Sequence, residues 1–319
     1  MKLLYKSVVL VFGGLLFFAV AALVAVWAPD LALDELKLRW AQPPSRFVLV
    51  DGLQVHLRDE GPQDDPEPVV LLHGTSDSLH TWDGWAQVLQ RQRRVIRFDL
   101  PGFGLTGPNA DNDYSVARYQ RFVGALLDHL GVQRCALVGN SLGGQIAWAT
   151  ALAQPQRVRR LVLVDAGGYP TPPQEVPLAF RLARNSGARK LLEHVLPRGL
   201  VQDSLRNLYG DKAKVTPALV DRYYDMALRP GNRRALGYGM DQALAAGDSH
   251  RIAQLALPTL VMWGGRDRLV PLQSGRQFAR DIAGARLVVF GDLGHLPHQE
   301  DPLGTVVEVQ RFLDLTAAN

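Results

Sequence analysis

The sequence predicts an α/β protein with a doubly wound, mostly parallel sheet, a helical cap inserted after the sixth strand, and an N-terminal transmembrane helix. Three observations support this fold class. Short apolar runs alternate with helical segments along most of the chain, a long helical stretch interrupts them once, and an uncharged apolar segment stands near the start. Alternation of strand and helix indicates a parallel sheet with helices on its faces.

The composition is that of an ordinary globular protein. Of its 319 residues 47% are hydrophobic and 21% charged, with a net charge of +4, which excludes a disordered or collagen-like chain. A single cysteine, Cys135, excludes an intrachain disulfide and a cysteine zinc cluster. Lysine and arginine form no cluster typical of nucleic-acid binding, so no nucleic-acid partner is expected.

Residues 1–30 are predicted to be a membrane anchor. From Ser7 to Ala28 there are 22 uncharged residues, preceded by Lys2 and Lys6. As a helix this segment would span about 33 Å, enough for a hydrocarbon core of about 30 Å. The lysines place the N-terminus in the cytoplasm and the catalytic body on the far side, which is the periplasm in a bacterium. A signal peptide cleaved after Val26-Trp27-Ala28, giving a secreted protein, and a buried helix are the alternatives.

The core is expected over residues 45–166 and 255–319. Phe47–Val50 and Leu53–Arg58 flank Asp51-Gly52, a typical two-residue hairpin turn. Six apolar runs without alternation follow, as expected of strands covered on both faces: Val69–Leu72, Val95–Phe98, Ala136–Val138, Leu161–Val164, Leu260–Trp263 and Leu287–Phe290. The predicted helices are Leu79–Gln90, Ser115–Leu130, Leu142–Ala153, Leu272–Ile282 and Gln299–Leu315.

The alternation stops between Gly167 and Gln254. This stretch contains helical segments such as Pro217–Leu228, with Thr216 as N-cap and proline at the first helical position. Residues 167–254 are therefore expected to form a helical cap over the carboxyl ends of the strands, where open α/β sheets bind ligands.

Three residues in chain order predict nucleophilic catalysis. Ser141 lies in Gly139-Asn140-Ser141-Leu142-Gly143, a G-x-S-x-G sequence between an apolar strand and a helix, where a sharp turn exposes the serine. A serine hydroxyl needs a base and an orienting carboxylate, and both follow at strand ends, as His295 and Asp267.

An oxyanion hole is predicted beside the serine. A tetrahedral intermediate needs preorganised donors, and the backbone N–H groups of Leu142 and Thr75 would supply them. Thr75 follows His73 and Gly74 in a turn after the first parallel strand, where His73 is expected to support the loop.

These segments together resemble the α/β-hydrolase superfamily. The resemblance covers about residue 46 to the end, except the cap, and its signature segments are His73-Gly74, Asp99–Gly104, Gly139–Gly144, Gly265–Pro271 and Gly294-His295. It is greatest to the capped branch of carboxylesterases, cofactor-free haloperoxidase-like enzymes and C–C hydrolases of aromatic ring-fission products. It implies an α/β-hydrolase fold without metal or cofactor.

Two features of the sequence argue against particular reactions found among these relatives, the first against C–C cleavage and the second against a carboxylate nucleophile. C–C hydrolases usually carry further glycine and proline after the His-Gly turn, whereas this chain has Thr75–His80. Serine at position 141 argues against epoxide hydrolases and haloalkane dehalogenases, which use a carboxylate nucleophile.

Four other residue patterns offer alternatives to this assignment. Gly102–Gly107 matches G-x-G-x-x-G, but Pro108 and a polar run follow where a nucleotide site needs a helix. Asp165 ends the strand before the cap and is an alternative acid, and His298 is an alternative base. His295, His298 and Glu300 could be imagined as metal ligands, although they match no known ligand motif.

The sequence thus predicts a membrane-anchored serine hydrolase that cleaves a small-molecule carboxylic ester through an acyl-enzyme. Ser141, His295 and Asp267 form the triad, and the membrane is a partner through the N-terminal helix. The alternatives are C–C hydrolysis or cofactor-free perhydrolysis on the same triad, and a non-catalytic membrane-tethered binding module.

Overall fold

An eight-stranded sheet forms the centre of the computed structural model, which describes residues 13–14, 17, 24, 26–170, 174–183, 185, 187, 190, 193–243 and 248–317. Its strands are ordered β1-β2-β4-β3-β5-β6-β7-β8. Their bounds are β1 (Arg46–Val50), β2 (Leu53–Glu60), β3 (Val69–Leu72), β4 (Val95–Phe98), β5 (Cys135–Asn140), β6 (Val158–Val164), β7 (Thr259–Gly264) and β8 (Arg286–Phe290).

The sheet is parallel from β4 to β8, and β2 is antiparallel to both β1 and β4. The β1–β2 hairpin turns at Asp51 and Gly52, both with positive φ (52° and 77°), as predicted for an Asp-Gly turn. The mostly parallel sheet expected from the sequence is confirmed, and the register pairs all six predicted apolar runs.

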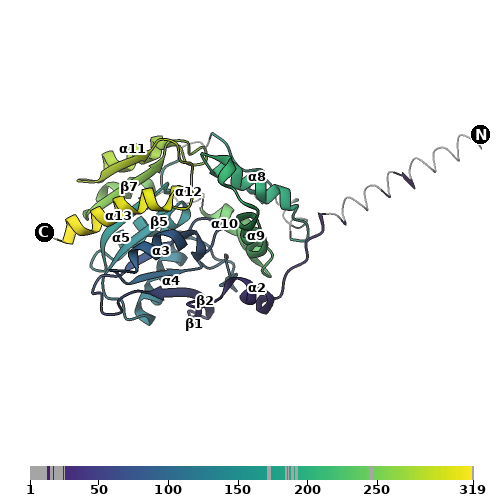
Figure 1. Cartoon of the computed structure of the whole chain (residues 1–319), viewed down its shortest axis with the longest axis horizontal. Helices are drawn as coiled ribbons and strands as arrows, with labels where there is room; N and C mark the ends of the chain where they lie inside the picture. Colours follow the sequence, from purple (N-terminus) through teal and green to yellow (C-terminus); the bar gives the residue numbers. More distant parts are fainter. Residues whose placement is uncertain are drawn as a thin grey trace, which may run out of the picture.

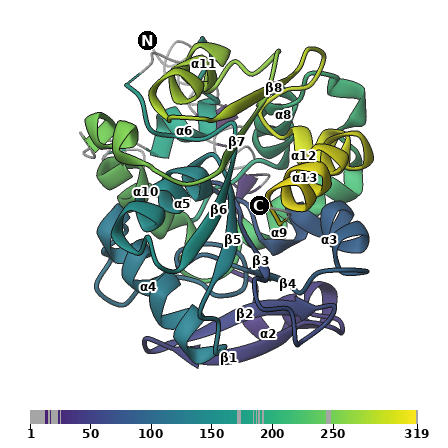
Figure 2. The same ribbon diagram turned by 90° about the vertical axis from the view of Figure 1, so that its left-hand side faces the viewer.

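Helices cover both faces of the sheet (Figure 2). One face packs against α4 (Val116–His129), α5 (Leu142–Ala153) and α11 (Leu272–Asp281). The other packs against α3 (Asp83–Leu89) and α13 (Pro302–Ala317). Successive residues of a strand enter opposite cores: Val70 and Leu72 contact the first group, whereas Val69 and Leu71 contact the second. Both faces are buried, which explains the continuous apolar runs.

Between β6 and β7 the described chain is helical, as predicted. The longer helices here are α6 (Leu178–Ala183), α8 (Arg198–Leu208), α9 (Pro217–Ala227) and α10 (Asn232–Ala243). Thr216 caps α9 by accepting a hydrogen bond from the Leu219 N–H, with Pro217 at the first helical position. Figure 1 shows α8, α9 and α10 together at one end of the sheet. We refer to this helical insertion as the cap.

Helix α2 (Leu33–Trp40), which lies against the cap, is not predicted by the sequence pattern. Its buried Leu36 packs with Leu105 and Met226. The Trp40 indole N–H donates to the Asp225 carboxylate of α9 at 2.9 Å. This eight-residue helix carries four charged residues, so its apolar pattern is too short to predict from sequence alone.

The predicted membrane anchor is corrected by the structure. Within the described residues, no helix has both the length and the apolar character needed to cross a membrane. Most of Ser7–Ala28 falls outside those residues. The prediction rested on the length of an uncharged segment, and such a length alone does not establish a membrane-spanning helix. This finding gives no support to the predicted transmembrane helix and membrane partner, and the predicted localisation, a membrane-anchored extracytoplasmic body, is corrected on it.

Candidate active site

Ser141 lies at a strained turn between β5 and α5. Its backbone angles, φ 55° and ψ −117°, are unfavourable for a residue with a side chain. The chain can make this turn because its neighbours are glycines. A Cβ at Gly139 would lie 2.2 Å from the Gly143 carbonyl oxygen, and one at Gly143 would lie 2.3 Å from that of Leu72. The G-x-S-x-G sequence therefore forms the expected strand–turn–helix arrangement.

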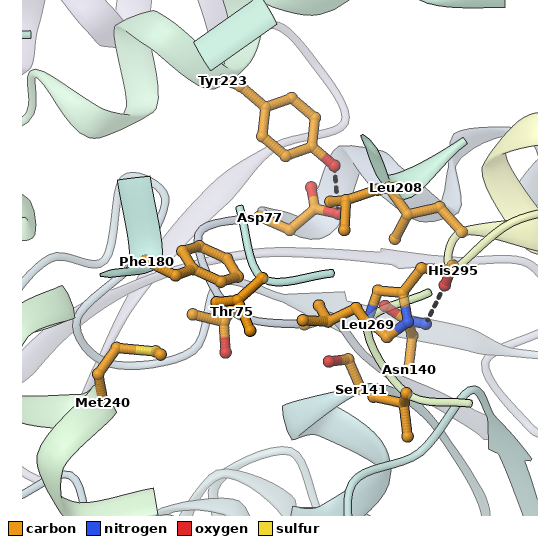
Figure 3. Close-up of a pocket in the computed structure, with 14 residues that line it drawn as sticks. Thr75, Asp77, Asn140, Ser141, Phe180, Leu208, Tyr223, Met240, Leu269 and His295 are labelled. Atoms are coloured by element: carbon orange, nitrogen blue, oxygen red, sulfur yellow. Dashed lines mark hydrogen bonds between the residues drawn. The ribbon is translucent and has the colours of Figure 1, made fainter. Parts of the chain in front are cut away.

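The structure brings His295 and Asp267 together. The imidazole Nδ1 lies 2.7 Å from Asp267 Oδ2, and both side chains are buried. The other oxygen, Oδ1, accepts hydrogen bonds from the backbone N–H groups of Leu269 (2.8 Å) and Val270 (3.0 Å). These donors hold the carboxyl group in place, and it in turn orients the imidazole. Figure 3 shows the Ser141 hydroxyl below that imidazole, and both residues line one pocket.

The predicted oxyanion donors flank the serine. Thr75 lines the pocket with Ser141, and Leu142 opens α5 next to it. Among the hydrogen bonds of the described residues, neither backbone N–H donates to another protein group. Gly74 lets this loop come close, because a Cβ there would lie 3.1 Å from the Ser141 Cβ. Two N–H groups beside a nucleophile are what a developing oxyanion requires.

His73 supports this loop, as expected. Its Nδ1–H donates to the Gly74 carbonyl oxygen at 2.7 Å, and its Nε2 accepts from the Leu100 N–H at 2.9 Å. With both nitrogens engaged and the side chain fully buried, His73 is not placed to act as a base.

The pocket over Ser141 has a volume of about 260 Å³ and lies between the core loops and the cap. The cap contributes mainly apolar side chains: Val176, Phe180, Leu208, Tyr223 and Met240. Asp77 is the acidic group in this lining, and it accepts a hydrogen bond from the Tyr223 hydroxyl at 2.6 Å. Figure 3 shows this pair on the side of the pocket away from Ser141. No lysine or arginine lines the pocket in the described part of the chain.

The alternative base is placed elsewhere. His298 is buried against Trp82, with ring centroids 4.1 Å apart, and its Nε2 lies 2.9 Å from Thr81 Oγ1. Burial, followed by the neighbouring His295, holds the pKa of His298 well below its usual value, so it stays neutral. It does not line the pocket.

The three residues considered as metal ligands, His295, His298 and Glu300, do not face one common site. Glu300 does not face a shared site with His295 and His298, because its two oxygens accept the backbone N–H groups of Gly210, Asp211 and Gly294. Among the described residues, Asp165, Asp267 and His295 do have ligand atoms within 4.8 Å of one another. Since His295 Nδ1 already bonds Asp267, this cluster is accounted for by the acid–base pair and its neighbour.

The glycine-rich segment Gly102–Gly107 is a loop, as predicted. The next helix along the chain, α4, begins only at Val116, so this segment lacks the helix N-terminus that a nucleotide phosphate would need. The glycines allow close packing instead: a Cβ at Gly104 would lie 2.2 Å from the Asp99 carboxylate.

The contacts that four residues make around the site were not predicted from the sequence. Asn140 donates from Nδ2 to the carbonyl oxygens of Val164 and His295, both at 3.1 Å, and so links the serine turn to the histidine loop. Asp77, Tyr223 and Glu300 contact residues far away in sequence. Asn140 stands beside the serine and could have been singled out, whereas the other three carry no local signal.

Comparisons with known proteins agree with this geometry. The family model of the α/β hydrolase fold matches residues 67–302. The 2-hydroxy-6-oxo-2,4-heptadienoate hydrolase of Pseudomonas putida strain F1 is 33% identical over 283 residues, covering 84% of this chain and 95% of that protein. A meta-cleavage product hydrolase from Pseudomonas fluorescens IP01 has a TM-score of 0.74 at 27% identity, covering 86% of this chain and 98% of that one. A bacterial membrane phospholipase A structure has a TM-score of 0.68 at 25% identity and covers 98% of both chains.

Proposed function

Since the chain belongs to the α/β-hydrolase family, we propose that it is a serine hydrolase that cleaves the C–C bond beside a ketone in ring-fission products. The relative from Pseudomonas putida supports this reaction. The compound in its name, a 2-hydroxy-6-oxo-dienoate, has no ester or amide bond, so its hydrolysis must break a C–C bond. This favours the alternative of the sequence analysis over simple ester cleavage.

The observation that carries the serine-hydrolase part of the proposal is the His295–Asp267 hydrogen bond, with His295 and Ser141 lining the same pocket. His295 would take the proton from the serine hydroxyl as its oxygen attacks the ketone carbon. The N–H groups of Thr75 and Leu142 would bind the resulting oxyanion. Before this attack the dienol moves its hydroxyl proton to the carbon next to the ketone and so becomes the keto form. As the intermediate collapses, the C–C bond breaks, its electron pair passes into the conjugated enolate of the departing fragment, and that enolate takes up the proton held by His295. Water activated by His295 then releases the carboxylic acid from Ser141.

Ester hydrolysis is the second candidate, and the pocket charge favours it. The compound named for the relative is a carboxylate, whereas the described lining here offers Asp77 and no cation. A neutral ester would meet no repulsion in this pocket. The similarity to a phospholipase, an enzyme named for ester substrates, points the same way.

One assay separates these reactions. The purified chain is given 2-hydroxy-6-oxohepta-2,4-dienoate, whose colour is lost on cleavage, and in parallel p-nitrophenyl butyrate with and without hydrogen peroxide. We expect dienoate cleavage that Ser141→Ala abolishes. Turnover of the ester alone would replace the first reaction with the second, and peracid formation would indicate perhydrolysis. If no substrate is turned over and a fluorophosphonate does not label Ser141, the serine-hydrolase assignment is wrong.

A further inference from the structure

Asp165 is a buried carboxyl group next to the triad that the proposed reaction does not use. It ends β6, between the strand that leads to Ser141 and the strand that leads to Asp267. Its side chain is fully buried, and its backbone has a positive φ of 46°. This unfavourable angle turns the side chain to a place where its carboxyl oxygens lie within 4.8 Å of ligand atoms of Asp267 and His295.

The hydrogen bonds of this carboxyl group are incomplete for an anion. Asp165 Oδ1 accepts from the Gly264 N–H at 2.9 Å. The other oxygen, Oδ2, is buried and meets no donor within the described residues. Asp267, in contrast, receives two backbone N–H groups and the imidazole. A second buried carboxyl group so close to Asp267, with one donor of its own, favours its protonated form.

A proton on Asp165 resolves the unpaired oxygen. Oδ2 then becomes a donor, and Asp267 is a carboxylate beside it, with carboxyl oxygens of the two residues within 4.8 Å of one another. We propose that Asp165 is a permanently neutral carboxylic acid that acts as a positioning residue, donating a hydrogen bond to Asp267 and so supporting the His295–Asp267 pair. This inference rests on the proposed triad for its catalytic consequence, but the protonation state does not depend on it.

The electrostatic surroundings agree with a neutral acid. Burial, then the charge of Asp267, raises the pKa of Asp165 well above its usual value, and Glu300 adds to the effect. The Gly264 N–H works in the opposite direction but is a single donor. Asp267 and Glu300 are the charged groups that raise the pKa of this carboxyl, and a ring nitrogen of His295 lies within 4.8 Å of it.

A pair of substitutions distinguishes a neutral donor from an ionised group. Asp165→Asn keeps an oxygen for the Gly264 N–H and an amide donor for Asp267. Asp165→Ala removes both. We expect kcat/KM and its pH profile to stay within about threefold of wild type in D165N. In D165A we expect kcat/KM to fall about tenfold, the effect of one lost hydrogen bond, and the acid limb of the profile to move to higher pH.

Infrared difference spectroscopy tests the protonation state without any activity. The spectrum of wild type minus D165N at pH 8 should contain the C=O band of a protonated buried carboxyl group, and this measurement stands even if D165A does not fold. A carboxylate band in its place would overturn the proposal. So would a loss of activity in D165N as large as that in D165A. If neither substrate class is hydrolysed, the proposed function fails, while the infrared result still decides the state of Asp165.

Discussion

Replacing Glu300 by Gln should weaken the contact between the cap and the histidine loop. Oε2 of Glu300 accepts from the N–H groups of Gly210 (3.0 Å) and Gly294 (2.9 Å), and Oε1 accepts from that of Asp211 (2.8 Å). Gly210 and Asp211 follow α8 of the cap, whereas Gly294 precedes His295. The carboxylate therefore joins the cap directly to the residue proposed as the base.

The expected loss follows from this geometry. A Gln amide has one acceptor oxygen, so its NH₂ group must face at least one of the three backbone donors. Hydrogen bonds to a charged group contribute about 1.5–3 kcal/mol each, and an unpaired buried N–H costs about 1–3 kcal/mol. We expect a destabilisation of about 3 kcal/mol, or a Tm lower by about 4–5 °C. Because Gly294 shifts with this bond, kcat/KM should also fall, by about tenfold to a hundredfold.

Urea unfolding and steady-state kinetics measure the two effects separately. Glu35→Gln is the matched control, because Glu35 is exposed and its ion pair with Arg39 lies on the surface. That control should change stability by less than about 1 kcal/mol. Unchanged stability in E300Q would show that the three hydrogen bonds contribute little. Lower stability with wild-type kcat/KM would show that Glu300 does not position His295.

Three further substitutions test separate features. Asp77→Asn should raise the preference for an anionic over a neutral p-nitrophenyl ester about 30-fold, since two unit charges about 8 Å apart repel by about 2 kcal/mol at an effective dielectric constant of about 20; an unchanged ratio of kcat/KM values would contradict this. His80 is buried, and burial lowers its pKa to about 3. The unfolded chain therefore binds a proton that the native state excludes between pH 6.5 and 3, and wild type should lose about 2–3 kcal/mol at pH 4.5 that H80Q retains in urea unfolding; equal losses in both proteins would refute it. Ser141→Gly should be about 1 kcal/mol more stable than Ser141→Ala, because glycine removes the strain of the positive φ, and this gain exceeds the extra entropy that glycine loses on folding; equal melting temperatures would show that the turn stores no strain.

The sheet could be predicted because its pattern is local. Each buried parallel strand is a continuous apolar run, and the Asp51-Gly52 turn specifies a hairpin by its own backbone preference. The serine turn is similarly local, since Gly139 and Gly143 are needed within five residues of one another. Asp267 and His295 could be identified because each follows a strand whose carboxyl end lies at the same edge of the sheet.

The remainder depends on contacts between distant segments. The Tyr223–Asp77 hydrogen bond joins residues 146 positions apart, and neither residue has a sequence neighbour that announces the pair. Helix α2 is short and highly charged, and its burial depends on Leu105 and Met226. The predicted membrane anchor has no support from the described residues for a different reason: the absence of charge in a segment does not determine whether that segment forms a spanning helix.

The side chains that line the pocket, more than the proposed triad, should determine which reaction takes place. Ser141, His295 and the N–H groups of Thr75 and Leu142 would treat a ketone and an ester carbonyl alike, because each gives the same tetrahedral oxyanion. The two reactions differ in the group that leaves and in the charge carried with it. A dienoate brings a carboxylate into a pocket whose described lining holds Asp77 and no cation, whereas a neutral ester does not. If the dienoate is the substrate, Asp77 must lower its affinity, and D77N should then increase kcat/KM for the dienoate while leaving that for p-nitrophenyl butyrate unchanged. If D77N leaves both values unchanged, the Asp77 charge plays no part in substrate choice, and the pocket no longer favours the ester.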